Sequence, residues 1–113
     1  MSNSDIIHED PGLSVRVEQD GETLVVSALG ELDSSNVQTL ERELRLAIAS
    51  GIPELFLDLG RVSFIDSAAL RVLLLMARQS LRNGGRLRML PGSPPVELAI
   101  EATGLGRSLP LLN

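Results

Sequence analysis

The segment Leu55–Met76 constrains the fold more than any other part of this chain. It opens with an apolar run interrupted only by Asp58, which is typical of a buried β-strand. After a short loop, the residues from about Ser67 to Arg82 are strongly apolar at helical spacing, and Asn83-Gly84-Gly85 ends the pattern. A strand that leads directly into a long helix predicts an α/β domain.

The predicted helix at 67–82 is unusually apolar, because it carries two apolar stripes instead of one. A helix of this kind is either deeply buried or presents one face to a partner, and we favour burial under neighbouring helices. Three arginines share one side of the helix and are expected to form its solvated edge. The first stripe is Leu70, Leu73, Leu74, Ala77 and Leu81, the second is Val72, Leu75 and Met76, and the arginines are Arg71, Arg78 and Arg82.

The remaining patterns predict strands and helices in alternation. Residues 1–12 are polar and are expected to be a flexible tail, whereas residues 13–113 are expected to form one domain. A turn at Asp20-Gly21 joins the first two strands into a hairpin. The order predicts an α/β fold with a mainly parallel sheet of four to five strands, an antiparallel hairpin strand at one edge and about three helices. The expected strands lie at 13–18, 23–29, 55–59, 86–90 and 109–112, and the other helices lie at 37–50 and 96–102.

Composition excludes several classes of function. The net charge is −5, with fifteen acidic residues against ten arginines and no lysine, so direct binding to nucleic acid is not expected. There is no cysteine, and His8 is the only histidine, so neither a metal site nor a cofactor is predicted. The longest apolar run is far shorter than the roughly 20 residues that span a membrane. We therefore expect a cytoplasmic protein that does not insert into membranes.

Conventional catalysis is poorly supported, so the chain is not expected to be an enzyme. A serine hydrolase needs a histidine base, and His8 is remote in sequence from Ser67. A phosphate-binding P-loop needs a lysine, which the chain lacks. The same lack argues against a phosphoaspartate receiver domain.

The step from Asp66 to Ser67 allows two interpretations. Both residues are ordinary capping residues, and a cap stabilises a helix by about 1 kcal/mol. The start of a helix also suits a phosphate, because free N–H groups and the helix dipole favour negative charge. A similar acidic residue followed by serines occurs at Asp33-Ser34-Ser35. Ser34, Ser35 and Asn36 are all good N-caps for the helix that follows, and we interpret the two serines as caps.

Three segments together resemble the anti-sigma-factor antagonists of the STAS domain family. The first is Gly30-Glu31-Leu32-Asp33, and the second runs from Leu57 through Asp66 to Ser67. The third is Ala102-Thr103-Gly104-Leu105 with the following Leu109-Pro110-Leu111. The likeness covers about residues 13 to 112.

This resemblance implies a binding protein of a bacterial partner-switching system. In such proteins a serine kinase, which is also the anti-sigma factor, phosphorylates the serine that corresponds to Ser67, and a PP2C-type phosphatase removes the phosphate. The unphosphorylated protein would bind the anti-sigma factor and free its sigma factor, thereby regulating transcription. Family members often have Ser-Gly or Thr-Gly after the phosphoserine, whereas this chain has Ala68-Ala69. The residues expected to contact the partner are Asp33, Asp66, Ser67, Ala68 and Arg71.

A second interpretation remains open beside the first. The chain would then be a STAS-type binding subunit of a transporter or of a signalling scaffold, without a phosphorylation switch.

Overall fold

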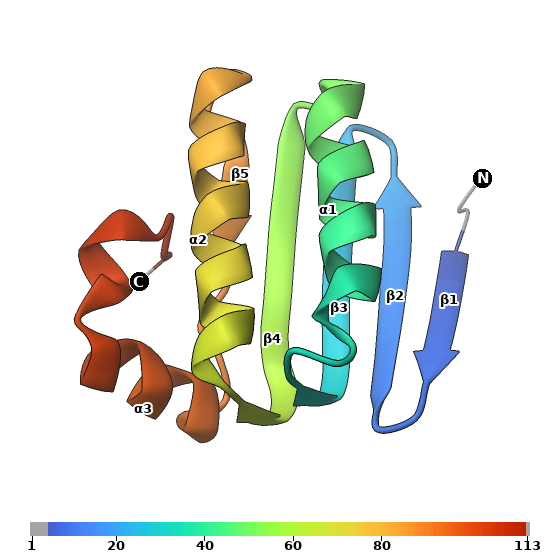
Figure 1. Cartoon of the computed structure of the whole chain (residues 1–113). Coiled ribbons are helices and arrows are strands. Elements are labelled where there is room, and N and C mark those ends of the chain that lie inside the picture. The colour runs from blue at the N-terminus through green and yellow to red at the C-terminus, as the bar shows by residue number, and fades with distance from the viewer. Residues whose placement is uncertain (1–4, 113) are drawn as a thin grey trace.

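A computed structural model describes residues 5–112 as one sheet with helices packed against it (Figure 1). The elements in chain order are β1 (Asp5–Asp10), β2 (Leu13–Asp20), β3 (Thr23–Leu32), α1 (Val37–Ser50), β4 (Glu54–Ile65), α2 (Ser67–Arg82), β5 (Leu87–Met89), α3 (Pro94–Thr103) and the short 3-10 helix η1 (Leu105–Ser108).

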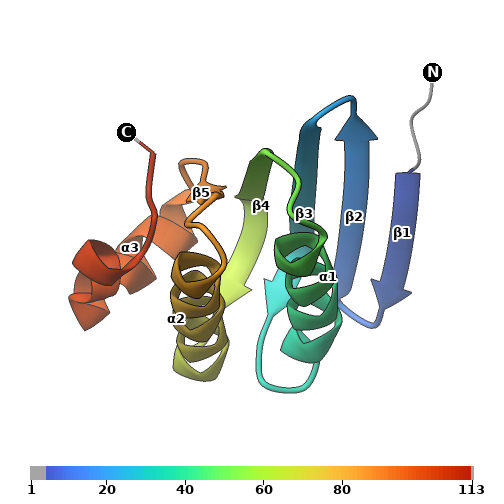
Figure 2. The same ribbon diagram turned by 90° about the horizontal axis from the view of Figure 1, so that it is seen from above.

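The sheet has five strands in the order β1-β2-β3-β4-β5, which confirms the α/β class and the hairpin predicted around Asp20-Gly21. β1 with β2 and β2 with β3 pair antiparallel, whereas β3 with β4 and β4 with β5 pair parallel. The sheet is therefore mixed, because the N-terminal segment adds a second antiparallel pair. Seen from above, α1 and α2 lie side by side over one face of the sheet (Figure 2).

The N-terminal segment differs from the sequence-based expectation of a tail through residue 12. Asp5–Asp10 form the edge strand β1, in register from Asp5 opposite Glu18 to Asp10 opposite Leu13. The sequence pattern did not predict this strand, because the segment is largely polar. The strand is held instead by main-chain hydrogen bonds to β2. The side chains of β1 and α1 also meet, since His8 Nε2 lies 2.8 Å from Glu43 Oε2. Residues 1–4 lie outside the described part of the chain.

The central strands are longer than their apolar patterns predict. β4 continues to Ile65 through the residues expected to form a loop, and β3 continues to Leu32. Their pairing shifts register between Ser27 and Leu29 and again between Gly30 and Glu31. These irregularities interrupt the alternation of apolar and polar residues, which is why the sequence pattern ends before the strands do.

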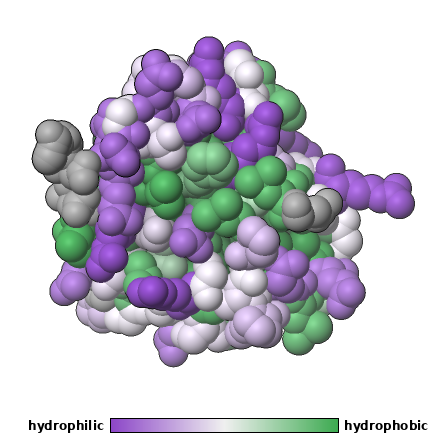
Figure 3. Space-filling model, turned by 180° about the vertical axis from the view of Figure 1, so that it is seen from behind, coloured by the Kyte–Doolittle hydropathy of each residue, from purple (hydrophilic) through white to green (hydrophobic). Residues whose placement is uncertain are grey.

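The hydrophobic core lies between the helices and one face of the sheet. Successive strand residues alternate between faces, so Val26 of β3 and Leu57 of β4 are buried under the helices, while Val25 and Phe56 lie half-buried on the other face. Figure 3 shows apolar patches among polar side chains on the side of the molecule opposite the view of Figure 1.

Helix α2 is buried along one stripe only. Leu70, Leu73 and Met76 are almost inaccessible, whereas Leu75 is 48% exposed and Leu81 is 73% exposed. The expectation that the whole apolar surface of this helix is covered is therefore wrong. A helix that packs on a sheet can bury only the side that faces it, so the outer residues stay in solvent.

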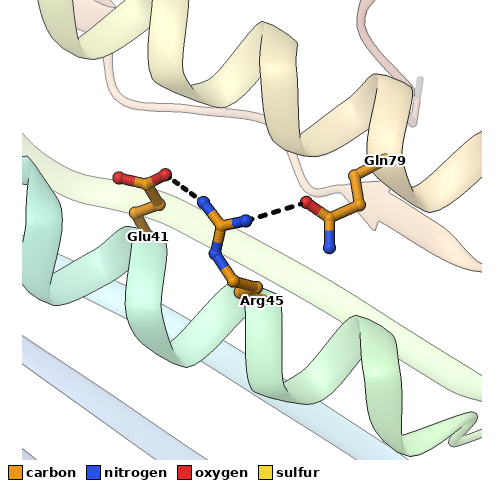
Figure 4. A network of polar contacts seen from close by, with 3 residues as sticks. All are labelled: Glu41, Arg45 and Gln79. Carbon is orange, nitrogen blue, oxygen red and sulfur yellow. Dashed lines mark hydrogen bonds and ion pairs between the residues drawn. The ribbon is translucent and has the colours of Figure 1, made fainter.

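A polar bridge joins the outer sides of the two helices (Figure 4). Arg45 of α1 forms an ion pair with Glu41 one turn earlier and donates a hydrogen bond of 3.4 Å to Gln79 Oε1 of α2. The Glu41 carboxylate is thus engaged by its own helix.

The C-terminal strand expected at 109–112 is reduced to one parallel bridge between Met89 and Leu111. The Met89 N–H donates to Pro110 O at 2.7 Å, and the Leu112 N–H donates to Met89 O at 2.8 Å. None of the helices in the described residues is long and apolar enough to cross a membrane.

Candidate functional site

The candidate site lies where the two central strands end. Leu32 of β3 pairs with Ile65 of β4, and both strands leave the sheet at this edge to enter α1 and α2. The main-chain N–H of Asp66 donates to Leu32 O at 3.2 Å, so the loop after β3 lies against the start of α2. This is the carboxyl end of parallel strands, the usual position of functional sites in α/β folds.

Asp66 caps α2 and also holds the neighbouring loop. Its backbone is extended, at φ −101° and ψ 173°, and its Oδ1 accepts a hydrogen bond of 2.8 Å from the Ala69 N–H. Its Oδ2 accepts a second bond, of 3.2 Å, from the Ser34 N–H of the loop before α1. The capping role expected for Asp66 is confirmed. Ser67 does not share it, because Ser67 is already the first helical residue.

Ser67 is consequently left with a free side chain at the surface. It is exposed, and its hydroxyl makes no hydrogen bond with any residue in the described part of the chain. Ala68 and Arg71 are exposed as well. Arg71 follows Ser67 by one helical turn, which places the two side chains on the same side of α2.

The loop before α1 is ordered by side chains that contact its own backbone. Asp33 Oδ1 accepts hydrogen bonds from the Ser35 hydroxyl at 2.6 Å and from the Ser35 N–H at 2.9 Å. These two bonds hold the pKa of Asp33 below its ordinary value. Asn36 accepts from the Asp33 N–H at 3.0 Å and donates to Glu31 O at 2.9 Å.

Of the three residues expected as caps of α1, the two serines do not occupy the N-cap position and the third does. The N-cap position belongs to Asn36, whose side chain makes no capping hydrogen bond. The serines lie further back in the loop, where the Ser34 N–H binds Asp66 and Ser35 binds Asp33. The structure thus brings Asp33 and Asp66 to one edge of the sheet through their bonds to this loop, although 33 residues separate them in sequence.

Two exposed apolar side chains, one at the end of β4 and one in the middle of α2, were not singled out as surface residues from the sequence. Phe64, at the end of β4, is 50% exposed, and Leu75 on the outer side of α2 is 48% exposed. The irregular pairing of β4 places Phe64 in solvent, and a pattern that assumes regular alternation cannot show this.

The chemistry available at this edge is that of a surface for binding or modification. Among the described residues, no three histidine or acidic side chains are grouped closely enough to hold a metal ion. A hollow of about 550 Å³ that includes Leu24 and Pro53 lies near the start of β3 and β4, the opposite end of these strands from Ser67. What the site offers is an exposed hydroxyl next in sequence to the ordered carboxylate of Asp66, which binds the loop that contains Asp33.

Comparisons with known proteins identify the family of this chain. The model of the STAS domain family matches residues 14–113. BtrV of Bordetella bronchiseptica, a protein named as an anti-sigma factor antagonist, is 36% identical over 90 residues, which are 80% of this chain and 78% of that protein. The anti-sigma F factor antagonist of Lysinibacillus sphaericus is 30% identical over 86 residues, 75% of this chain and 74% of that one.

Solved structures show the same fold. The anti-sigma factor antagonist SpoIIAA in its unphosphorylated form superposes with a TM-score of 0.69 at 27% identity, covering 88% of each chain. The phosphorylated form of SpoIIAA, a Bacillus cell fate determinant, gives a TM-score of 0.64 at 27% identity, covering 88% of this chain and 91% of that one.

Proposed function

The chain belongs to the STAS domain family, and from this premise we propose that it is an anti-sigma-factor antagonist controlled by phosphorylation of Ser67. In the unphosphorylated state it binds an anti-sigma factor and so releases the sigma factor for transcription. The observation that carries the proposal is the free, exposed hydroxyl of Ser67, which is available because Asp66 provides the helix cap. A serine that served as the cap would have its oxygen engaged.

The likeness to SpoIIAA supports control by phosphorylation, since that protein has been solved in a phosphorylated and in an unphosphorylated form. By the family resemblance, the kinase is the anti-sigma factor itself, and a PP2C-type phosphatase restores the hydroxyl. The protein then acts as a binding module rather than as an enzyme.

The proposed contact surface consists of Asp33, Asp66, Ser67, Ala68 and Arg71. A phosphate adds a charge of about −1.5 to −2 at pH 7, next to the carboxylate of Asp66. A partner surface that is complementary to a neutral hydroxyl must then remove water from this charge or place it against groups that do not neutralise it. Both cost binding free energy. A loss of about 3 kcal/mol in binding free energy weakens affinity roughly 100-fold, which is enough to exchange partners.

A pull-down with defined variants tests the proposal. We expect the wild type and Ser67→Ala to retain an ATP-binding anti-sigma kinase, and Ser67→Asp to lose it. Ser108→Asp is the matched control, because it adds the same charge at another exposed serine, in η1. In vitro phosphorylation by the recovered kinase, mapped by mass spectrometry, is expected to label Ser67 and to fail on Ser67→Ala.

Two outcomes contradict the proposal. Labelling at another residue, with Ser67→Ala still a substrate, removes the switch from Ser67. Retention of every partner by Ser67→Asp favours instead a STAS-type binding subunit that lacks a phosphorylation switch.

A further inference from the structure

Helix α2 carries a row of positive charge on the side where Ser67 lies. Arg71, Arg78 and Arg82 are all exposed, and the helix contains no acidic residue. None of the three guanidinium groups has a hydrogen-bond or ion-pair partner within residues 5–112. At 100° per residue these arginines lie within about 60° of Ser67 around the helix axis.

We propose that Arg71 is a phosphate-positioning residue, whose guanidinium binds the phosphate on Ser67 of the same helix. The inference rests on the proposed phosphorylation of Ser67 and adds to it the residue that holds the phosphate in place. Of the three arginines, only Arg71 is one turn from Ser67. Residues four apart on a helix have their Cβ atoms about 5–6 Å apart, within reach of a long side chain.

The order of the two charges along the helix also favours this contact. An anion four residues before a cation is the stabilising orientation, since it places negative charge toward the helix N-terminus. Phosphate and guanidinium groups can form two parallel, charge-assisted hydrogen bonds, which give the contact a defined geometry. The Arg71 side chain is available for it, because no other described residue engages it.

The surroundings of Ser67 increase the need for such a cation. Both oxygens of the Asp66 carboxylate accept backbone hydrogen bonds, and the carboxylate of Asp33 is held in the loop that Asp66 contacts. A phosphate on Ser67 therefore adds negative charge at the residue next to an existing carboxylate. Binding to Arg71 offsets this repulsion without disturbing the cap of α2.

The contact changes two features of the partner surface in one step. Phosphorylation introduces a negative charge at Ser67 and at the same time withdraws Arg71 from any partner group that it contacts. Both changes occur on the same side of the first turns of α2, so a partner loses a favourable group and meets an unfavourable one.

Phosphoserine incorporated at position 67 during protein synthesis allows a direct test without a kinase. The phosphate is titrated by phosphorus NMR in the otherwise wild-type protein, in Arg71→Gln and in Arg78→Gln. Arg78 is the matched control, because it is exposed and without a partner among the described residues, and it lies roughly 16 Å from Ser67 along the helix. Circular dichroism checks that all three proteins are folded.

We expect Arg71→Gln to raise the midpoint of the phosphate titration by about 0.3–1 pH unit, because an adjacent cation favours the dianion. Arg78→Gln is expected to leave the midpoint within about 0.1 pH unit of the wild type, because exposed charges at this separation are largely screened. The midpoint of Arg71→Lys is expected to lie between those of the wild type and Arg71→Gln, because lysine keeps the positive charge.

An unchanged midpoint in Arg71→Gln overturns the proposal. An equal shift in both glutamine variants also overturns it, because it would indicate the overall electrostatic potential of the helix instead of a direct contact. Failure of the proposed function is distinguishable, because it would appear as a lack of labelling at Ser67 by the recovered kinase. The titration does not depend on that kinase.

Discussion

At the scale of single residues, Asp66 connects the two helices that begin at the candidate site. One carboxylate oxygen caps α2 through the Ala69 N–H, and the other binds the Ser34 N–H in the loop before α1. The geometry at the start of α2, where Ser67 lies, and that of the loop before α1 therefore depend on a single side chain.

Asp66→Ala is expected to lower the free energy of unfolding by about 1–2 kcal/mol, because it removes the helix cap and leaves the Ser34 N–H without its partner. Ser67→Ala, which removes an unpartnered hydroxyl at the surface, should change it by less than about 0.5 kcal/mol. Urea unfolding followed by circular dichroism measures both values. Equal losses in the two variants would show that Ser67 shares the cap.

Asp33 makes the stability of the loop depend on pH. Its pKa is lowered in the folded protein, chiefly by the Ser35 hydroxyl and next by the Ser35 N–H. A carboxyl with a depressed folded-state pKa stabilises the fold above its unfolded-state pKa, and this contribution is lost as the pH falls through the folded-state value.

Ser35→Ala should therefore raise the pKa of Asp33 toward the ordinary value, as measured by carbon NMR titration of the side-chain carboxyl. The stability difference between the wild type and Ser35→Ala is expected to be largest near neutral pH and to shrink below the ordinary pKa of aspartate. A difference that stays constant down to strongly acidic pH would contradict this account of the Asp33 pKa.

At the scale of elements, β3 depends on a glycine at its irregular end. Gly30 has φ +108°, and a Cβ there would lie 2.2 Å from the main-chain oxygen of Gly12. The Glu31 N–H donates to that same oxygen at 2.7 Å, which draws the two backbone segments together.

Gly30→Ala is expected to destabilise the protein by about 3 kcal/mol or more, because the clash with backbone adds to the strain of a positive φ. Gly21→Ala is the control, since Gly21 has φ +62° and nothing lies within 4 Å of its added Cβ. That variant should lose only about 1–2 kcal/mol. Comparable losses in thermal or urea unfolding would argue against the close approach at Gly30.

Helix α2 contains both buried and exposed leucines, which should contribute differently to stability. Leu73→Ala should cost about 2–5 kcal/mol of unfolding free energy, because it opens a cavity at a residue that is 2% exposed. Leu81→Ala, at a residue 73% exposed, should cost less than about 0.5 kcal/mol. Urea denaturation distinguishes the two, and a large loss in Leu81→Ala would mean that the Leu81 side chain is covered in solution.

At the scale of the whole molecule, stability should be highest at the centre of the sheet. β3 and β4 each pair on both sides and contact the helical core, whereas β1 is an edge strand and β5 has only three residues. Hydrogen exchange followed by mass spectrometry should therefore find the slowest amides in β3 and β4, and much faster exchange in β1. Exchange in β1 as slow as in β3 would contradict this order.

The charge of the whole molecule is distributed unevenly over its elements. The chain carries a net charge of −5, yet α2 bears three arginines and no acidic residue. Composition revealed the net charge and therefore disfavoured nucleic acid as a partner. It could not show that one side of α2 is basic and that its arginines form no ion pair within residues 5–112. That contrast arises because helical periodicity gathers the arginines on one side, while tertiary packing buries the opposite side.

The sequence by itself determined which segments become helices and core strands, because periodic apolar residues specify a buried face locally. The bounds of α2, the hairpin at Asp20-Gly21 and the Asp66–Ser67 step were all predictable in this way. Tertiary structure alone decided that Asp5–Asp10 join the sheet, that Phe64 and Leu75 are exposed, and that the Asp66 carboxylate also binds the Ser34 N–H of the other loop. These features depend on main-chain pairing and on contacts between residues distant in sequence. A linear pattern does not contain such contacts, because it records only the spacing of residues along the chain.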